Sequence, residues 1–310
     1  MNREKFSSNL LLLTTSTIWG FGFVAQEMGS DHLGPNAFNS ARYSIGAVCL
    51  MVILLAWHRG KSMNGFRSRD WVKASLSAGL FLFLGSLLQQ AGIGDESTGP
   101  GKAGFITGLY VVIVPLLGLG LGHRTNAQMW AGVALATVGL WLLSFNLDNE
   151  QWAIRRGDLL VFFGSFCWAA HVLVIDRFTN RVSSLHLALG QVTVCAGASW
   201  VASALVEPME LASFRAAFLP ALNLGSMSIA IAFTMQIIGQ RNAHPTHASI
   251  IFAMEAVVGV FAGWLILHEQ LTQRELAGCL LMFCGMVLSQ LPVRLIRLGL
   301  TSRANDKPPP

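Results

Sequence analysis

Residues 36–57 read NAFNSARYSIGAVCLMVILLAW and carry one charged side chain, that of Arg42. A helix crosses the hydrocarbon core of a bilayer with about 20 predominantly apolar residues, so this stretch is long enough to span a membrane. Its apolar residues form a continuous run and do not alternate with polar ones, which argues against a strand of a membrane barrel. The stretch therefore predicts a membrane-spanning helix that contains a charge.

The rest of the chain has the same apolar character. Of its 310 residues, 53% are hydrophobic and 12% are charged, and the mean hydropathy is +0.54. Soluble domains carry roughly 25% charged residues, so the composition excludes a soluble globular enzyme, a disordered chain and a fibrous protein. The five cysteines lie in apolar runs without a Cys-x-x-Cys pair, so we expect no disulfide framework and no metal site.

Apolar runs separated by charged residues, Gly and Pro predict an all-α integral membrane protein with ten transmembrane helices. The first run follows Arg3 and Lys5 and lacks a small-x-small cleavage site. Because it is long enough to span, we expect a retained helix and not a removed signal peptide. The predicted helices are 9–28, 36–57, 71–92, 101–121, 127–145, 157–177, 184–205, 218–239, 247–268 and 273–291.

The distribution of basic residues predicts that both termini are cytoplasmic. Of the 21 Lys and Arg residues, Arg42 lies inside a span, five fall on one side of the membrane, and all the others fall on the side of the termini. The five are Lys102, Arg155, Arg156, Arg215 and Arg274. Cytoplasmic loops carry an excess of Lys and Arg, and the membrane surface there is anionic. The formal net charge of +5 is explained in this way, and no nucleic-acid partner is expected.

The two halves of the chain resemble each other weakly, with matches that occur in the same order. The matched pairs are Trp19 and Trp168, Arg42 and Gln191, Pro100 and Pro245, Ala103 and Ala248, Tyr110 and Glu255, Gly132 and Gly278, and Gly139 and Gly285. Chance matching of apolar segments is the alternative for any single pair. Five spans is an odd number, so a second five-span half is inverted relative to the first. We predict one repeat over 1–146, an inverted repeat over 157–292, and a disordered cytoplasmic tail over 293–310.

Several of these motifs carry a family resemblance. Trp19-Gly20 lies in the first predicted span, and Arg42 follows Pro35 by seven positions in the second. Residues 244–258 read HPTHASIIFAMEAVV, and residues 268–272 read HEQLT before the last span. In these features the chain resembles the EamA-type branch of the drug/metabolite transporter superfamily, over about residues 10 to 291.

The resemblance implies a fold and a function. Helices one to four and six to nine would line a central cavity, and helices five and ten would pack behind it. The protein would be a secondary transporter that moves a small polar metabolite, such as an amino acid, by alternating access. Export would be the commoner direction, without a cofactor or an ATP site. The location would be the plasma membrane, most simply a bacterial inner membrane.

Ionisable residues inside membrane spans are energetically expensive and are candidates for function. Three stand out in this chain. The guanidinium of Arg42 could hold a substrate carboxylate or phosphate, or it could be structural and pair with Glu27 or with helix-end carbonyls. Glu255 could exchange protons or hold an amino group, or it could bond to neighbouring hydroxyls. His171 could relay protons, or it could simply be packed against a hydroxyl.

Uncharged side chains add further candidates for the lining of the cavity. Trp19 and Trp168 could gate the cavity or stack on a ligand, with core packing as the alternative. Tyr110 could bond the substrate through its hydroxyl. Gln89 and Gln236 take similar late positions in their spans and could bind a polar substrate or bond between helices. The residues from Gly101 to Gly108 lack the spacing of a phosphate-binding loop, so no nucleotide site is expected there.

The sequence thus predicts a transporter, with proton coupling as one option. A facilitative exchanger or a channel for small metabolites is the alternative, and a membrane-embedded enzyme is a further, less favoured one. The expected partners are a small polar metabolite, the lipid bilayer and, for the coupled mechanism, protons. Both a monomer and a homodimer are compatible with the sequence.

Overall fold

The computed structural model describes residues 3–57, 68–95, 98, 100–144, 155–208, 210–267 and 272–291. Within these residues every regular element is a helix, as the sequence predicts. The predicted tail, 293–310, lies outside the described residues. The helices of the first half are α1 (Arg3–Ser30), α2 (Pro35–Trp57), α3 (Arg69–Ile93), α4 (Pro100–Gly108), α5 (Tyr110–Gly120) and α6 (Ala127–Ser144).

The second half contains α7 (Arg156–Phe178), α8 (Ser184–Val206), α9 (Leu211–Ala216), α10 (Phe218–Asn223), the π-helix η2 (Leu224–Ala232), α11 (Phe233–Gln240), α12 (Pro245–Phe252), α13 (Met254–Leu267) and α14 (Gln273–Gln290). Local sequence explains several of the helix starts. The side chain of Ser68 caps α3, and Pro245 occupies the first turn of α12, where its missing N–H is not needed. Thr272 and Glu275 form a reciprocal capping box at the start of α14.

Eight helical stretches of the described chain are long and apolar enough to cross a membrane, and α6 contributes a shorter apolar stretch, Ala127–Leu143. The predicted tenth span forms α14, which is not among these eight. Its first turn carries Arg274 and Glu275, and these charges lower its mean hydropathy.

The fourth and ninth predicted spans are interrupted, which the sequence analysis does not anticipate. The first break lies at Leu109, between α4 and α5, and the second lies at Ala253, between α12 and α13. At both places the backbone makes hydrogen bonds to the residue three positions earlier, as in a tight 3₁₀ turn: Val112 N–H donates to Leu109 O and Ala256 N–H to Ala253 O. The breaks therefore occur within one residue of matching places in the two halves.

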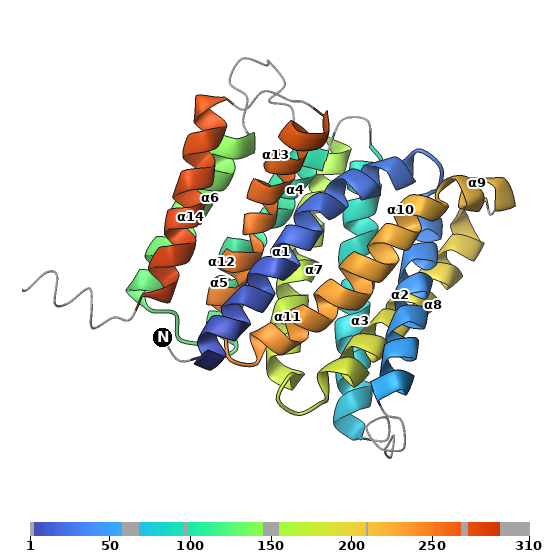
Figure 1. Ribbon diagram of the computed structural model, residues 1–310, viewed down its shortest axis with the longest axis horizontal. Coiled ribbons are helices and arrows are strands. Elements are labelled where there is room, and N and C mark those ends of the chain that lie inside the picture. The colour runs from blue at the N-terminus through green and yellow to red at the C-terminus, as the bar shows by residue number, and fades with distance from the viewer. Residues whose placement is uncertain are drawn as a thin grey trace, which may run out of the picture.

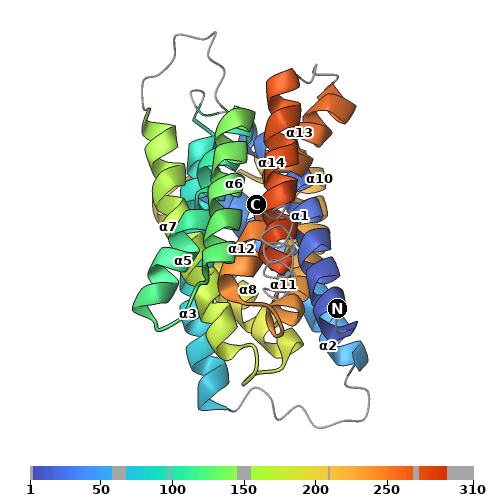
Figure 2. The same ribbon diagram turned by 90° about the vertical axis from the view of Figure 1, so that its left-hand side faces the viewer.

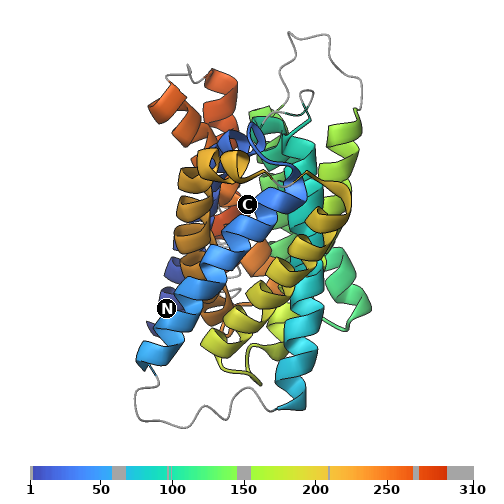
Figure 3. The ribbon, with the colours of Figure 1, turned by 90° about the vertical axis from the view of Figure 1, so that its right-hand side faces the viewer.

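Two helix pairs form opposite sides of the bundle (Figure 1). On one side α6 packs along α14, and Figure 2 shows this pair facing the viewer. Their backbones approach closely because they meet at glycines. A Cβ added at Gly139 would lie 2.6 Å from the carbonyl oxygen of Gly278. On the other side α2 crosses α8, as Figure 3 shows.

The remaining contacts follow a pattern in which the two halves exchange roles. Helix α3 packs against α7 and α8, while α11 and η2 pack against α1 and α2 respectively. Likewise α1 packs against α12 and α13, while α7 packs against α4 and α5. Each of these contacts has a counterpart in which the halves are swapped.

The start of α1 and the end of α14 lie at the same end of the bundle (Figure 1). A hydrogen bond joins them, from Asn9 Nδ2 to Gln290 Oε1 at 2.9 Å. At the other end Lys102 Nζ lies 2.6 Å from Asp158 Oδ2 and ties the first turn of α4 to that of α7. Between the ends are two clusters of buried apolar side chains, and Trp19 and Trp168 pack against both. These two tryptophans therefore lie at the centre of the bundle.

Candidate functional site: a central polar cavity

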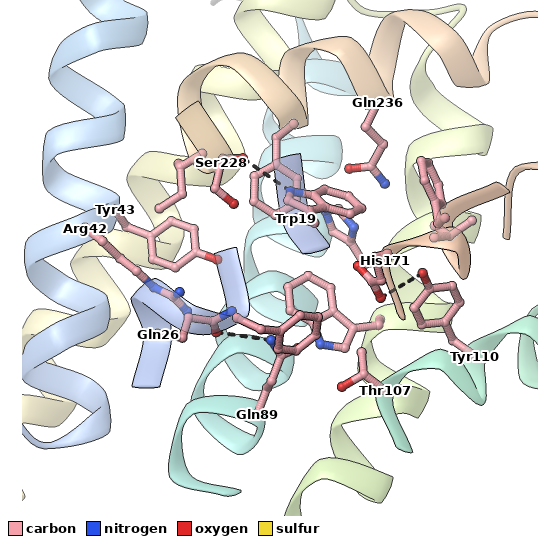
Figure 4. A pocket seen from close by; sticks show the side chains of 17 residues that line it. Trp19, Gln26, Arg42, Tyr43, Gln89, Thr107, Tyr110, His171, Ser228 and Gln236 are labelled. Carbon is pink, nitrogen blue, oxygen red and sulfur yellow. Dashed lines mark hydrogen bonds between the residues drawn. The ribbon is translucent and has the colours of Figure 1, made fainter. Parts of the chain in front are cut away.

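A cavity lies where the two apolar clusters meet, and all eight side chains selected from the sequence line it: Trp19, Arg42, Gln89, Tyr110, Trp168, His171, Gln236 and Glu255. The rest of the lining consists of Phe23, Gln26, Tyr43, Thr107, Val172, Ser228, Ile229, Phe233 and Phe252. The lining comes from both halves of the chain. Figure 4 shows Arg42, Gln26 and Tyr43 on one side of the cavity, with Tyr110, Thr107 and Gln236 on the other.

Arg42 is 5% exposed, and no acidic side chain of the described residues forms an ion pair with it. Its Nε donates to Asn39 Oδ1 at 2.8 Å, one turn earlier on α2. Its guanidinium carbon lies 5.5 Å from the ring centre of Phe38 and 5.3 Å from that of Tyr43. These contacts hold the stem of the side chain, and Nε makes the one hydrogen bond found for the Arg42 side chain among the described residues.

Glu255 is 4% exposed and accepts a hydrogen bond of 3.0 Å from the hydroxyl of Tyr110. These two residues are the repeat equivalents predicted from the sequence. Tyr110 is the first residue after the break at Leu109, and Glu255 is the second residue after the break at Ala253. Both side chains line the cavity. Discontinuous helices at a central site are typical of secondary transporters. Glu255 has a neutral partner and no cationic one among the described residues.

His171 lies on α7. Its Nε2 is 2.9 Å from Oε1 of Gln191, and both side chains are buried. Gln191 is the repeat equivalent of Arg42, so the second half places a neutral amide where the first half places a charge. The described part of the chain gives His171 a neutral hydrogen-bond partner, and this geometry favours a packed histidine over a proton relay.

Aromatic rings form the wall between the two sides of the cavity. Phe233 lies at their centre, with ring centres 5.1 Å from Trp19, 6.4 Å from Trp168 and 5.8 Å from His171. Trp19 also donates from Nε1 to the carbonyl of Ser228 in the π-helix, at 3.4 Å. π-Helices are rare in proteins and are frequently found at functional sites. The rings offer an apolar surface to any ligand that reaches between Arg42 and Glu255.

The two predicted glutamines take part in different amide networks. Gln89 Nε2 donates to Gln26 Oε1 at 3.1 Å, on the side of Arg42. Gln236 Nε2 donates to Gln240 Oε1 at 2.9 Å, on the other side. The bond of Gln89 joins α3 to α1, as in the interhelical alternative, whereas the bond of Gln236 lies within α11. Both side chains line the cavity.

The sequence analysis misses more than half of the lining. Phe233 and Phe252 sit in apolar runs, where an aromatic ring that faces a cavity looks the same as one that faces lipid. Tyr43 directly follows Arg42 in the sequence, and this position next to a candidate residue is a signal from which it could have been selected. Among the described residues, no group of three His, Cys, Asp or Glu side chains is placed to hold a metal ion.

The fold and the site together define a class of protein, a helical membrane protein in which two halves of the chain surround a polar cavity. The chain matches the model of the EamA-like transporter family over residues 6–145 and 155–291. It therefore belongs to this family, and with it to the drug/metabolite transporter superfamily, as the motifs in its sequence indicate.

Two relatives agree with this assignment. The chain is 24% identical to the uncharacterized transporter YoaV of Bacillus subtilis, over 90% of this chain and 94% of the relative. It is 25% identical to an uncharacterized transporter of Archaeoglobus fulgidus, over 94% and 88% of the two chains. A solved crystal structure with 19% identity matches the fold with a TM-score of 0.77, over 94% of this chain and 98% of its own.

The family and the helices make this chain a membrane transporter located in the plasma membrane. Both comparisons also favour a transporter over the membrane-embedded enzyme that the sequence leaves as an alternative.

Proposed function

We propose that the protein is a secondary transporter of a small zwitterionic metabolite of the amino-acid class. The observation that carries the proposal is that one cavity is lined by a basic and an acidic side chain, neither of which has an ion partner among the described residues. Arg42 would bind the carboxylate through its terminal NH₂ groups, and Glu255 would bind the amino group. The aromatic wall around Phe233 would hold the apolar part of an amphipathic ligand.

The proposed topology is ten transmembrane helices in two inverted repeats, with both termini in the cytoplasm. The exchanged helix contacts support the repeat, since an axis between two inverted halves would generate them. Contact between Tyr110 and its repeat equivalent Glu255 agrees, because equivalent residues can touch only near such an axis. The excess of Lys and Arg at the end that holds the described termini supports the orientation.

Transport in this proposal occurs by alternating access, with the two halves rocking about the cavity. The breaks at Leu109 and Ala253 would serve as hinges, because they divide helices that line the cavity. The ends of the bundle would open in turn. Export is the direction that we propose, and proton coupling would use Glu255.

The test is counterflow into proteoliposomes loaded with unlabelled amino acids, with labelled members of the same panel outside and with or without a proton gradient. Saturable counterflow of one amino acid is the expected result, and its stimulation by the gradient would support coupling through Glu255. Gradient-independent exchange would favour a facilitative exchanger. Flux that neither saturates nor counterflows would favour a channel, and the absence of any flux would contradict the proposed substrate class.

A further inference from the structure

Gln236 and Gln240 form a chain of buried amides that ends at a backbone carbonyl. Gln236 Nε2 donates to Gln240 Oε1 at 2.9 Å, and Gln240 Nε2 donates to the carbonyl oxygen of Val172 at 3.0 Å. The two glutamines are four positions apart on α11 and lie on one face of the helix. Both side chains are 1% exposed.

The carbonyl of Val172 fixes the orientation of both amides. A carbonyl oxygen accepts but cannot donate, so Gln240 must turn its NH₂ group toward Val172. Its oxygen then faces Gln236, and Gln236 must in turn direct its own NH₂ group toward Gln240. A flip of either amide would place two oxygens against each other. The only orientation that satisfies the chain leaves Gln236 Oε1 pointing away from it.

Among the described residues, Gln236 Oε1 is a buried acceptor without a hydrogen-bond partner, and Gln236 lines the cavity. Buried polar atoms are nearly always hydrogen-bonded, so an unpartnered acceptor on a cavity wall is available to a donor that enters the cavity. Thr107 Oγ1 is also buried and unpartnered and lines the same cavity. Figure 4 places both residues on the side of Tyr110, opposite Arg42.

We infer that Gln236 is a specificity-determining residue that accepts a hydrogen bond from the substrate's amino group, and that Gln240 is the positioning residue that keeps its oxygen turned toward the cavity. An ammonium group has three N–H donors. Glu255, Gln236 and Thr107 would provide one acceptor for each donor. The inference rests on the proposed function and adds to it a reason for preferring a substrate with an unmethylated amino group.

The test compares two ligands of the full-length protein purified in detergent. One is the amino acid that gives the strongest counterflow, and the other is the carboxylic acid of the same skeleton without the amino group. For leucine the pair is L-leucine and 4-methylpentanoate. Dissociation constants are measured from the quenching of tryptophan fluorescence, since Trp19 and Trp168 line the cavity. The native protein should bind the amino acid about tenfold more tightly or better.

Gln240→Leu and Gln236→Leu should each reduce that preference to about threefold or less, by weakening binding of the amino acid alone. Gln240→Asn, whose amide is one methylene shorter, should act in the same way and serves if the leucine variant does not fold. Gln90→Leu is the matched control. Gln90 is also 1% exposed and donates to a backbone carbonyl, that of Gln26, at 2.9 Å, but it does not line the cavity. It should keep the native preference.

The outcomes separate this inference from the proposed function. If folded variants of Gln240 keep the native preference, or lose affinity for both ligands equally, the positioning role is wrong while the proposed substrate class stands. If the native protein binds no amino acid, the proposed function and this inference both fail.

Discussion

At the end of the bundle where α4 and α7 begin, Lys102 and Asp158 neutralise each other at 2.6 Å. In the central cavity, Arg42 and Glu255 line one space without an ion pair. Asp158 also accepts hydrogen bonds from the hydroxyl of Thr98 and from the backbone N–H of Arg155. Lys102 and Asp158 thus have their partners within the protein, whereas Arg42 and Glu255 have no ion partner among the residues that the structure describes.

This difference separates structural charges from functional ones. Burial of an unpaired charge carries a desolvation penalty that can be several kcal/mol, and only a binding partner recovers it. A charge that already has its partner has little left to offer a ligand. The comparison therefore predicts that substitutions in the cavity will affect binding much more than stability, and that substitutions at the end of the bundle will do the reverse.

The largest effect is expected for Arg42→Lys. Lysine keeps the positive charge but loses the planar pair of donors that fits a carboxylate, so binding of the amino acid should weaken by about 10-fold to 100-fold. The melting temperature in detergent should change by only a few degrees. Equal losses in binding and in stability would show that Arg42 is structural and would remove the contrast with Lys102.

Glu255→Gln should weaken binding of the amino acid nearly as much, by about tenfold or more, because the amide keeps the shape but not the charge. Tyr110→Phe is the matched comparison. It removes the neutral hydrogen-bond donor to Glu255 and leaves the carboxylate in place, so its effect should stay below about tenfold. Isothermal titration of the two variants measures both values, and a larger loss for Tyr110→Phe would assign the main role to the hydroxyl.

Lys102→Met should change binding by less than about threefold. The side chain of Lys102 is 39% exposed, and an exposed ion pair contributes about 0–1 kcal/mol to the free energy of unfolding. A small fall in the melting temperature is the expected consequence. A loss of binding comparable with that of Arg42→Lys would mean that paired charges at the bundle end take part in substrate recognition.

The smallest expected effect is a dependence of stability on pH. It involves a histidine at the end of the bundle opposite to Lys102. His244 precedes α12 and packs edge-on against His123, with ring centres 5.9 Å apart. Burial, and secondly the charge of His123, lower the pKa of His244 below its usual value of 6.5. The unfolded chain therefore takes up a proton at a higher pH than the folded one, and stability should decrease as the pH falls below about 6.5.

Melting curves at pH 7.5 and 5.5 test this effect. His244→Asn retains a side chain that can cap α12 and should make the fall in melting temperature smaller. A fall of the same size in the variant would assign the pH dependence to other groups.

The sequence predicts the helices well because a membrane span must be long and apolar, and this constraint is visible without a structure. It does not predict the breaks at Leu109 and Ala253, because no proline lies at either position. Ionisable, amide and mid-span aromatic side chains could be selected individually from the sequence, and all eight of those selected line the cavity. Their role in binding stays a prediction.

Other features depend on how helices face each other, which a single sequence does not reveal. Phe233 becomes the centre of the aromatic wall only because η2 and α11 turn it toward Trp19. Gln240 matters only because Val172, on another helix, presents its carbonyl.

The most direct test of the account is the affinity of the native protein for three related ligands: an amino acid, the amine without its carboxylate, and the acid without its amino group. Leucine, 3-methylbutylamine and 4-methylpentanoate form such a set. If Arg42 and Glu255 each bind one charge of the substrate, the zwitterion should bind about tenfold more tightly, or better, than either of the others. If the amine or the acid binds as tightly as the amino acid, the claim that both charges of the cavity serve one substrate is contradicted.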